Sequence, residues 1–304
     1  MTFSTVSCDE DDDHNPTETI TTIAQRTENL SIFAHALDRT GLRTTLGDPT
    51  TSYTVFAPTN EAFRVFLQDY SNDINNVPVD QLRHILVNHI LHLEIYAANL
   101  PNGGYVTTGT VNVPGTDYFS LYVNKSSGIR LNNSATIVNR NIRATNGVIH
   151  TVDAVIQLPT ITTHLRANPA LSTLTGLLTR PGQHDFANTL NNSGTYTVFA
   201  PINDAFSELD RELPGGMASL DDGNISNVLG YHVVPVRVLS GAIGGQTLPT
   251  SLILPTPQTL TVNTINNGLQ ITDARNRISD IGTTDILATN GVIHAVGRVL
   301  LPTL

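Results

Sequence analysis

The chain has 304 residues, which is enough for one large domain or for two domains of about 150 residues each. Hydrophobic residues make up 39% of it, so a core can form and a disordered protein is excluded. The formal net charge is −10, charged residues are only 14% of the chain and Lys125 is its single lysine, which argues against nucleic acid as a partner.

An acidic tail is expected over residues 1–16. Residues 9–13 are all acidic and few apolar side chains surround them, so this segment has little to bury and should be mobile. The spaced ligands and the glycine of a calcium loop are missing there. The only cysteine, Cys8, lies beside the acidic run, so no disulfide can form within the chain.

No transmembrane segment is predicted, because no apolar stretch reaches the roughly 18 residues that cross a membrane. The first thirty residues also lack the positively charged region and the apolar region of a signal peptide. The expected location is extracellular or at the cell surface if a signal peptide was trimmed, and cytoplasmic otherwise. The candidate glycosylation sites are the asparagines of five N-x-S/T sequons, about as many as this composition gives by chance: Asn29, Asn124, Asn132, Asn191 and Asn224.

Two blocks of sequence occur twice at one spacing. The segment TVFAPTNEAF at Thr54–Phe63 returns as TVFAPINDAF at Thr197–Phe206, 143 residues later. The segment ATNGVIH at Ala144–His150 returns unchanged at Ala288–His294, 144 residues later. A period this long indicates a duplicated domain and not a solenoid.

Each copy is predicted to form one domain, over residues 17–158 and 159–304, with almost no linker near Pro159. Strand-like alternating runs outnumber helical ones, and both kinds occur inside each copy. We therefore predict an α+β fold, with two tandem domains that are each a β-sandwich or wedge with several packed helices.

In the first block, the β-branched and aromatic run Thr54–Pro58 predicts a short strand that ends at the proline. A helix is predicted to follow, and Asn60 and Asn203 are the preferred N-caps because both copies have asparagine there. Ala62 and Phe66 would lie on the inward face of the helix. Every residue of this block has a structural explanation.

Between the blocks, Asn88-His89 aligns with Tyr231-His232. An alternating strand is predicted to start at each histidine and to run on through Leu93 in the first copy, with His89 and His232 facing the core. The second block predicts a tight turn with positive φ at each Asn-Gly, followed by a last strand. In that strand His150 and His294 share a face with valines, so all four histidines are expected to be buried and structural.

The TVFAP-x-N-x-AF box, the central tyrosine-histidine pair and the terminal NGVIH box resemble the three signature segments of the fasciclin, or FAS1, family. The resemblance covers about residues 17–304, and its one departure is Asn88, where the second copy has Tyr231. It implies a secreted or surface-attached protein that acts in adhesion or matrix contact and binds protein or glycan partners. No RGD triplet is present for an integrin contact.

Enzymatic signatures are missing from the sequence: no G-x-S-x-G elbow, P-loop, dinucleotide fingerprint or H-E-x-x-H motif occurs. His89-x-x-His92 has a strand spacing that puts the two rings on opposite faces, so no metal site is predicted, and no cofactor is expected. The leading prediction is therefore a non-catalytic interaction protein of adhesion type, rich in polar, uncharged surface residues.

The alternative is an intracellular small-molecule-binding protein, or a cofactor-free enzyme of secondary metabolism with isomerase, dehydratase or cyclase chemistry. Its candidate catalytic groups are His84, His92 and Glu94, because strand alternation turns the last two away from the core in the first copy. Pro235 and Arg237 replace them in the second copy, as a site confined to one domain would require.

Overall fold

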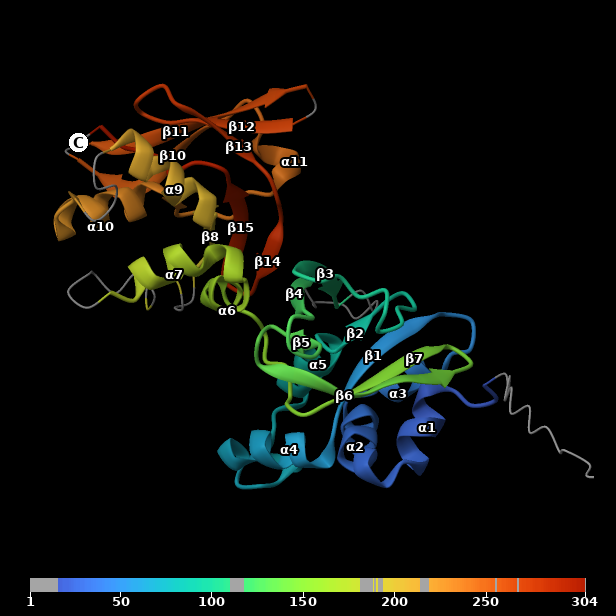
Figure 1. The fold of residues 1–304 in the computed structure, drawn as a ribbon. Helices are drawn as coiled ribbons and strands as arrows, with labels where there is room; N and C mark the ends of the chain where they lie inside the picture. The colour runs from blue at the N-terminus through green and yellow to red at the C-terminus, as the bar shows by residue number, and fades with distance from the viewer. Residues whose placement is uncertain are drawn as a thin grey trace, which may run out of the picture.

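The computed structural model describes residues 16–109, 118–180, 188, 190, 194–213, 219–254, 256–266 and 268–303. The chain forms two units of mixed helices and strands, drawn from blue to green and from yellow to red in Figure 1. The predicted pair of α+β domains is confirmed. The expected mobile segment, apart from its last residue, lies outside the described residues, as do Cys8 and the sequon at Asn191.

Domain 1 begins with helices and ends with strands. Its helical elements are α1 (Ile20–Arg26), η1 (Glu28–Leu30), α2 (Ser31–Thr40), α3 (Leu42–Gly47), α4 (Asn60–Phe66), η2 (Leu67–Tyr70), η3 (Ile74–Asn76) and α5 (Val79–Val87). Its strands are β1 (Tyr53–Pro58), β2 (Ile90–Leu91), β3 (Gly104–Thr108), β4 (Phe119–Asn124), β5 (Arg130–Leu131), β6 (Ala135–Ala144) and β7 (Gly147–Val152).

Domain 2 follows the same order. Its described helical elements are α6 (Ile161–Ala167), η4 (Pro169–Leu171), α7 (Ser172–Leu178), α9 (Asn203–Glu212), α10 (Asp222–Tyr231) and α11 (Ser240–Ile243). Its strands are β8 (Tyr196–Pro201), β9 (Val233–Val234), β10 (Thr247–Ile253), β11 (Pro257–Ile265), β12 (Gly268–Thr272), β13 (Ile278–Ile281), β14 (Ile286–Ala288) and β15 (Gly291–Val296).

One bent sheet runs through each domain. The strand order is β2-β1-β7-β6-β5-β4-β3 in domain 1 and β10-β11-β12-β13-β15-β8-β9 in domain 2, where β14 also pairs with β15. The central pairs β1/β7 and β8/β15 are parallel and the other pairs are antiparallel. The first and last blocks of each repeat are therefore direct neighbours, with Phe56 opposite His150 and Phe199 opposite His294.

The central strands are buried on both faces. In β1, Val55 and Ala57 belong to the core beneath the helices, whereas Phe56 belongs to a second core on the other face of the sheet. All six residues of β7 and all six of β15 are buried. A buried Phe or Val side chain contributes roughly 1.5–3 kcal/mol, so these strands contribute substantially to the stability of each domain.

The predicted N-cap role of Asn60 and Asn203 is wrong. Helix α4 is capped by Thr59, whose Oγ1 accepts a hydrogen bond from the Ala62 amide at 3.2 Å. Asn60 is the first helical residue, and its side chain reaches back to accept from the Ile32 amide at 3.0 Å and to donate to the Glu28 carbonyl at 2.8 Å. Asn203 makes the matching contacts to η4 and α7 in domain 2. Both copies have asparagine there because it connects two helical segments.

The predicted strands after His89 and His232 are much shorter than expected. Each ends after two residues, at β2 and β9, and Leu93, which should have faced the core, is 50% exposed. The cause is the Thr54 hydroxyl, which donates to the Leu93 carbonyl at 2.7 Å and accepts from the Ile95 amide at 2.8 Å. The Thr197 hydroxyl bends the chain of domain 2 in the same way.

The two Asn-Gly turns need glycine. Gly147 has φ +134° and Gly291 has φ +154°, and an added Cβ would lie 1.9 Å from the Tyr53 carbonyl oxygen in domain 1 and 2.1 Å from that of Tyr196 in domain 2. The asparagine before each glycine is buried, and Asn146 accepts from the Ile20 amide at 2.9 Å. This residue therefore ties the first helix of the domain to its last strand.

The two domains contact each other through β3 and β4 of domain 1 and α6 and β14 of domain 2, which lie side by side in Figure 1. The Leu287 amide donates to the Ser120 hydroxyl at 2.9 Å. Tyr105 packs against the core of domain 2, with its ring 5.6 Å from that of His164, and its hydroxyl accepts from Asn168 at 3.3 Å. Across the described ranges, no helix is long and apolar enough to cross a bilayer.

Candidate functional site

The histidines of the last strands are buried, as the alternation predicts, and both ring nitrogens of each are used. His150 Nε2 donates to the Ile95 carbonyl at 3.0 Å, and its Nδ1 accepts from the Asn141 amide at 3.2 Å. His294 makes the same two bonds, with Val238 and Asp285. Burial lowers the pKa of both rings, so they are neutral near pH 7. A ring held in this way has no free nitrogen for proton transfer.

The second pair of histidines connects a helix end to the segment after the last strand. His89 Nδ1 donates to the Ile85 carbonyl at 2.7 Å, and its Nε2 accepts from the Ile156 amide at 2.9 Å. His232 repeats this pattern with Val228 and with the Leu300 amide. Burial lowers the pKa of His89 and of His232 to about 4. The geometry explains these histidines as structural.

The residue before this histidine differs between the domains. Asn88 is buried in domain 1, where its Nδ2 donates to the Gln157 carbonyl at 3.2 Å and its Oδ1 accepts from the Thr108 hydroxyl at 2.9 Å. Tyr231 is buried at the same place in domain 2, and its hydroxyl donates to the Thr259 carbonyl at 2.7 Å. Burial raises the pKa of the tyrosine to about 12. Both side chains connect α5 or α10 to the rest of their domain.

The three candidate catalytic residues lie on two elements. His84 is half-buried on α5, with its Nδ1 2.6 Å from the Asp80 carbonyl, whereas His92 and Glu94 are exposed in the bend after β2. The His92 ring packs 5.2 Å from that of Tyr53. None of the three lines either of the two pockets described next. Their role in catalysis stays a prediction.

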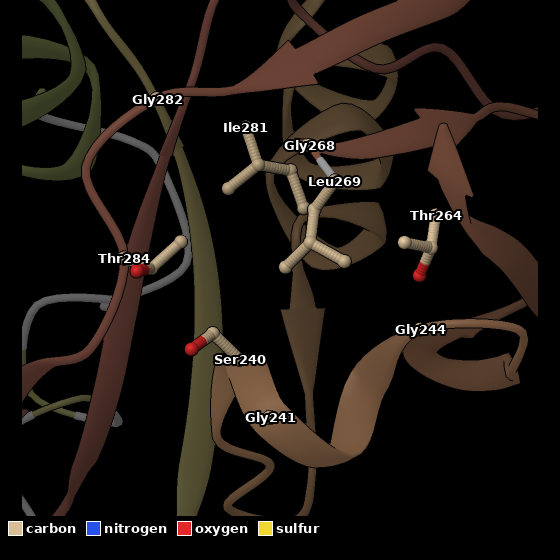
Figure 2. Close-up of a pocket in the computed structure, with 9 residues that line it drawn as sticks. All are labelled: Ser240, Gly241, Gly244, Thr264, Gly268, Leu269, Ile281, Gly282 and Thr284. Atoms are coloured by element: carbon tan, nitrogen blue, oxygen red, sulfur yellow. The ribbon is translucent and has the colours of Figure 1, made fainter. Parts of the chain in front are cut away.

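Each domain has an open pocket at an equivalent place, beside the histidine of the last strand. The domain 2 pocket has a volume of about 560 Å³, and Figure 2 shows the side chains of Leu269 and Ile281 at its centre, while Gly241 and Gly244 contribute only backbone. The lining residues are Ser240, Gly241, Gly244, Thr264, Gly268, Leu269, Ile281, Gly282 and Thr284. The pocket is thus lined by uncharged residues, most of them small, around two apolar side chains.

The domain 1 pocket has a volume of about 540 Å³. It is lined by Ala97, Ala98, Lys125, Gly128, Ile129, Arg140 and Asn141. The strand pairing, Asn124 with Arg130 and Asn263 with Gln270, shows which residues of the two linings are equivalent. The matching pairs are Ala97 with Ser240, Ala98 with Gly241, Lys125 with Thr264, Gly128 with Gly268, Ile129 with Leu269 and Arg140 with Thr284. This pair of pockets was missed in the sequence analysis, although the single lysine, at a position where the other copy has Thr264, was a visible signal.

One equivalent position, Asn141 in domain 1 and Asp285 in domain 2, fixes the wall of each pocket. Asn141 Oδ1 accepts from the Ala97 amide at 2.9 Å, and Asp285 Oδ1 accepts from the Ser240 amide at 2.9 Å. Asn141 and Asp285 also hold the buried histidines through their own amides. Their φ values, +63° and +55°, suit asparagine and aspartate. The last-strand histidine therefore supports the loop that borders each pocket.

Within the parts of the chain that the structure describes, no three His, Cys, Asp or Glu side chains gather as a metal site would require. The sequons differ in accessibility: Asn29 is exposed, and Asn124 and Asn224 are half-buried. Asn132 is buried: its Nδ2 is enclosed, and its Oδ1 accepts from the Tyr122 amide at 2.8 Å. Glycosylation of the described sequons stays a prediction, and Asn29 is the most accessible of them.

The fasciclin domain model matches residues 28–159 and 169–302. Human periostin is 28% identical over 257 residues, which cover 83% of this chain but only 28% of periostin. Aurofusarin biosynthesis cluster protein S of Gibberella zeae is 27% identical over 292 residues, which cover 84% of this chain and 70% of that protein.

Among solved structures, a FAS1 domain pair from the insect cell adhesion molecule fasciclin I matches with a TM-score of 0.52 and 21% identity. The match covers 90% of this chain and 97% of the domain pair, and so shows the fold. The duplicated boxes, the fold and two tandem matches to one family model lead to one conclusion: the chain belongs to the fasciclin family, of which it contains two domains.

Proposed function

We propose that this chain is a non-catalytic interaction module of adhesion or extracellular-matrix type, which binds a protein or glycan partner outside the cell. The observation that carries the proposal is the use of the repeated motif residues. The four buried histidines each make two internal hydrogen bonds, and Asn60 and Asn203 connect helical segments. Groups held in this way support a scaffold, and binding is left to its surface.

Two further observations favour this function. The matched domain pair comes from a cell adhesion molecule. The pockets are open and combine polar and small groups with a few apolar side chains, as suits a saccharide or a loop of a protein partner better than a reaction that must exclude water. Because the chain spans only 28% of periostin, further domains of a longer protein could add to such binding.

The test is an array of glycans and matrix proteins probed with the purified chain. Saturable, competable binding supports the proposal, and absence of binding across the array contradicts it. Fragments 17–158 and 159–304, the proposed domains, should each unfold cooperatively and can be probed in the same way to find which of them binds.

A second candidate function is a cofactor-free enzyme, or a small-molecule-binding protein, of secondary metabolism. The relative named as an aurofusarin biosynthesis cluster protein favours it, because its similarity extends over 84% of this chain and 70% of that protein. His84, His92 and Glu94 are the proposed catalytic groups. Native mass spectrometry that detects a stoichiometric small ligand, with a reaction that is lost in His92→Ala and Glu94→Ala, would establish this function instead.

A further inference from the structure

The two equivalent pockets differ in charge. Lys125 and Arg140 line the domain 1 pocket where Thr264 and Thr284 line the domain 2 pocket. None of the residues lining either pocket is acidic. The positive charge of domain 1 at this place therefore comes from two side chains that the other copy of the unit lacks.

A third position changes in the same direction. We call Asn141 and Asp285 the clamp residues, because each accepts a hydrogen bond from the loop that borders its pocket. The clamp residue of domain 2 is a carboxylate, and that of domain 1 is a neutral amide. Both side chains accept the same backbone hydrogen bond, so the fold needs only an oxygen acceptor there. Three substitutions between the copies thus make one pocket cationic in a chain whose net charge is −10.

The charge of Lys125 is available to a ligand. Its Nζ donates to the Ala98 carbonyl at 2.9 Å, which orients the side chain along the pocket rim but is a neutral partner. An ammonium group has three donors, so further N–H groups remain for an anion. Arg140 is exposed on β6 and lines the same pocket. Its planar fork suits a carboxylate.

We propose that the domain 1 pocket binds a carboxylate group through Lys125 and Arg140. The volume of about 540 Å³ is that of a site for one or two sugar rings, so a uronic acid residue of an acidic polysaccharide fits, and a free small carboxylic acid offers the same chemistry. The inference rests on the proposed glycan-binding function and names its ligand class. Domain 2, with an uncharged pocket, does not share this preference.

The single lysine allows a direct test on the full chain. An amine-reactive acetylating reagent modifies Lys125 and the N-terminus, and mass spectrometry separates the two. Digalacturonic acid should slow the acetylation of Lys125 but not of the N-terminus, whereas the neutral disaccharide maltose should slow neither. Benzoate forms the third arm: protection by benzoate and not by digalacturonate identifies a free small acid as the source of the carboxylate.

The second part of the test uses variants in which lining residues are exchanged between the two pockets. Calorimetry measures how tightly each variant binds digalacturonate and benzoate. Lys125→Thr with Arg140→Thr gives domain 1 the residues of domain 2 and should weaken binding of the carboxylate by at least about tenfold. Thr264→Lys with Thr284→Arg should create a second site, since both threonines line the domain 2 pocket. Arg211→Thr, on the exposed face of α9, is the matched control and should leave binding unchanged.

Loss of binding in Arg211→Thr to the same extent as in the pocket variant would reveal only a general charge effect and overturn the inference. Equal protection of Lys125 by maltose would also overturn it while leaving glycan binding intact. Absence of protection by both acids overturns it too, and in that case saturable binding on the glycan and matrix array still upholds the proposed function.

Discussion

Domains 1 and 2 have the same framework but differ where that framework meets a ligand or the other domain. Both copies contain the histidine pairs, the threonine that bends the chain after β2 or β9 and the asparagine before the turn glycine, and these residues make the same bonds. The copies differ at Asn88 and Tyr231, at the pocket linings and at the domain contact, where His164 of domain 2 stands in place of Ile23. Residues shared by the two copies therefore maintain the fold, and residues that differ between them give each domain its own surface properties.

Acidic pH should produce the largest difference between the two domains in loss of stability. Burial lowers the pKa of three histidines to about 4, one in domain 1 (His89) and two in domain 2 (His164 and His232). Unfolded chains bind protons on these rings below about pH 6.5, and the folded rings do so only near pH 4, so stability is complete above pH 6.5 and falls between the two values. Protonation of each of these histidines should lower the free energy of unfolding of its domain by roughly 3 kcal/mol between about pH 6.5 and pH 4.

The denaturation midpoint of domain 2 should therefore fall further than that of domain 1 when the pH is lowered. Urea titration at neutral pH and near pH 4.5, with hydrogen exchange to distinguish the domains, measures the difference. His164→Ile gives domain 2 the residue that domain 1 has at this place and should remove most of its additional acid sensitivity. Equal acid sensitivity of both domains before and after this change would refute the prediction.

Replacement of the turn glycines should affect both domains about equally. Gly147→Ala and Gly291→Ala each place a Cβ near 2 Å from a carbonyl oxygen of the parallel neighbour strand, at positive φ. The central strand pair must then shift, at a cost of about 3 kcal/mol. Thermal denaturation measures it. Gly176→Ala is the control: it lies within helix α7 with open space around its Cβ, and it should be neutral or stabilising.

Loss of the helix-end histidine should destabilise each domain less. His89→Ala leaves the Ile156 amide and the Ile85 carbonyl without their buried partner, and His232→Ala does so for Leu300 and Val228. The expected loss is about 1–3 kcal/mol in the free energy of unfolding at neutral pH. Urea denaturation of the matched pair checks it, and exposed His92→Ala, which should change stability by less than about 0.5 kcal/mol, is the control.

The smallest expected effect concerns the residue that differs before this histidine. Tyr231→Phe removes the hydroxyl that donates to Thr259 and should cost about 0.5–1.5 kcal/mol in domain 2 alone. Thr108→Val is the matching change in domain 1, because it removes the donor to Asn88 Oδ1. Domain-resolved hydrogen exchange measures both. A larger loss in the other domain would show that the two cores are coupled.

The sequence predicted the features that depend on local chemistry or on repetition. The duplication, the strand that stops at Pro58, the glycine turns and the burial of His150 and His294 all follow from residue type and spacing. Errors arose where a side chain acts over a long distance. Asn60 binds residues about 30 positions earlier in the chain, so its presence in both copies was mistaken for capping.

The pockets could not be predicted because their linings come from separate segments. The domain 1 pocket combines residues 97–98, 125–129 and 140–141, which only the folded sheet and the clamp by Asn141 bring together. The early end of β2 has a similar origin, because it depends on the Thr54 hydroxyl from another strand. Alignment of the two copies with attention to their differences would have indicated Lys125 and Arg140.

The contact made by Tyr105 and Ser120 has a consequence for long partners. It joins the two domains side by side and so restricts the distance and direction between the surfaces that they present. A partner long enough to reach both domains, bound at one of them, meets the other at an effective concentration that reaches about the millimolar range for a short span. Two weak contacts would then combine into one strong attachment, and a change at Tyr105 would reduce avidity without altering either binding surface.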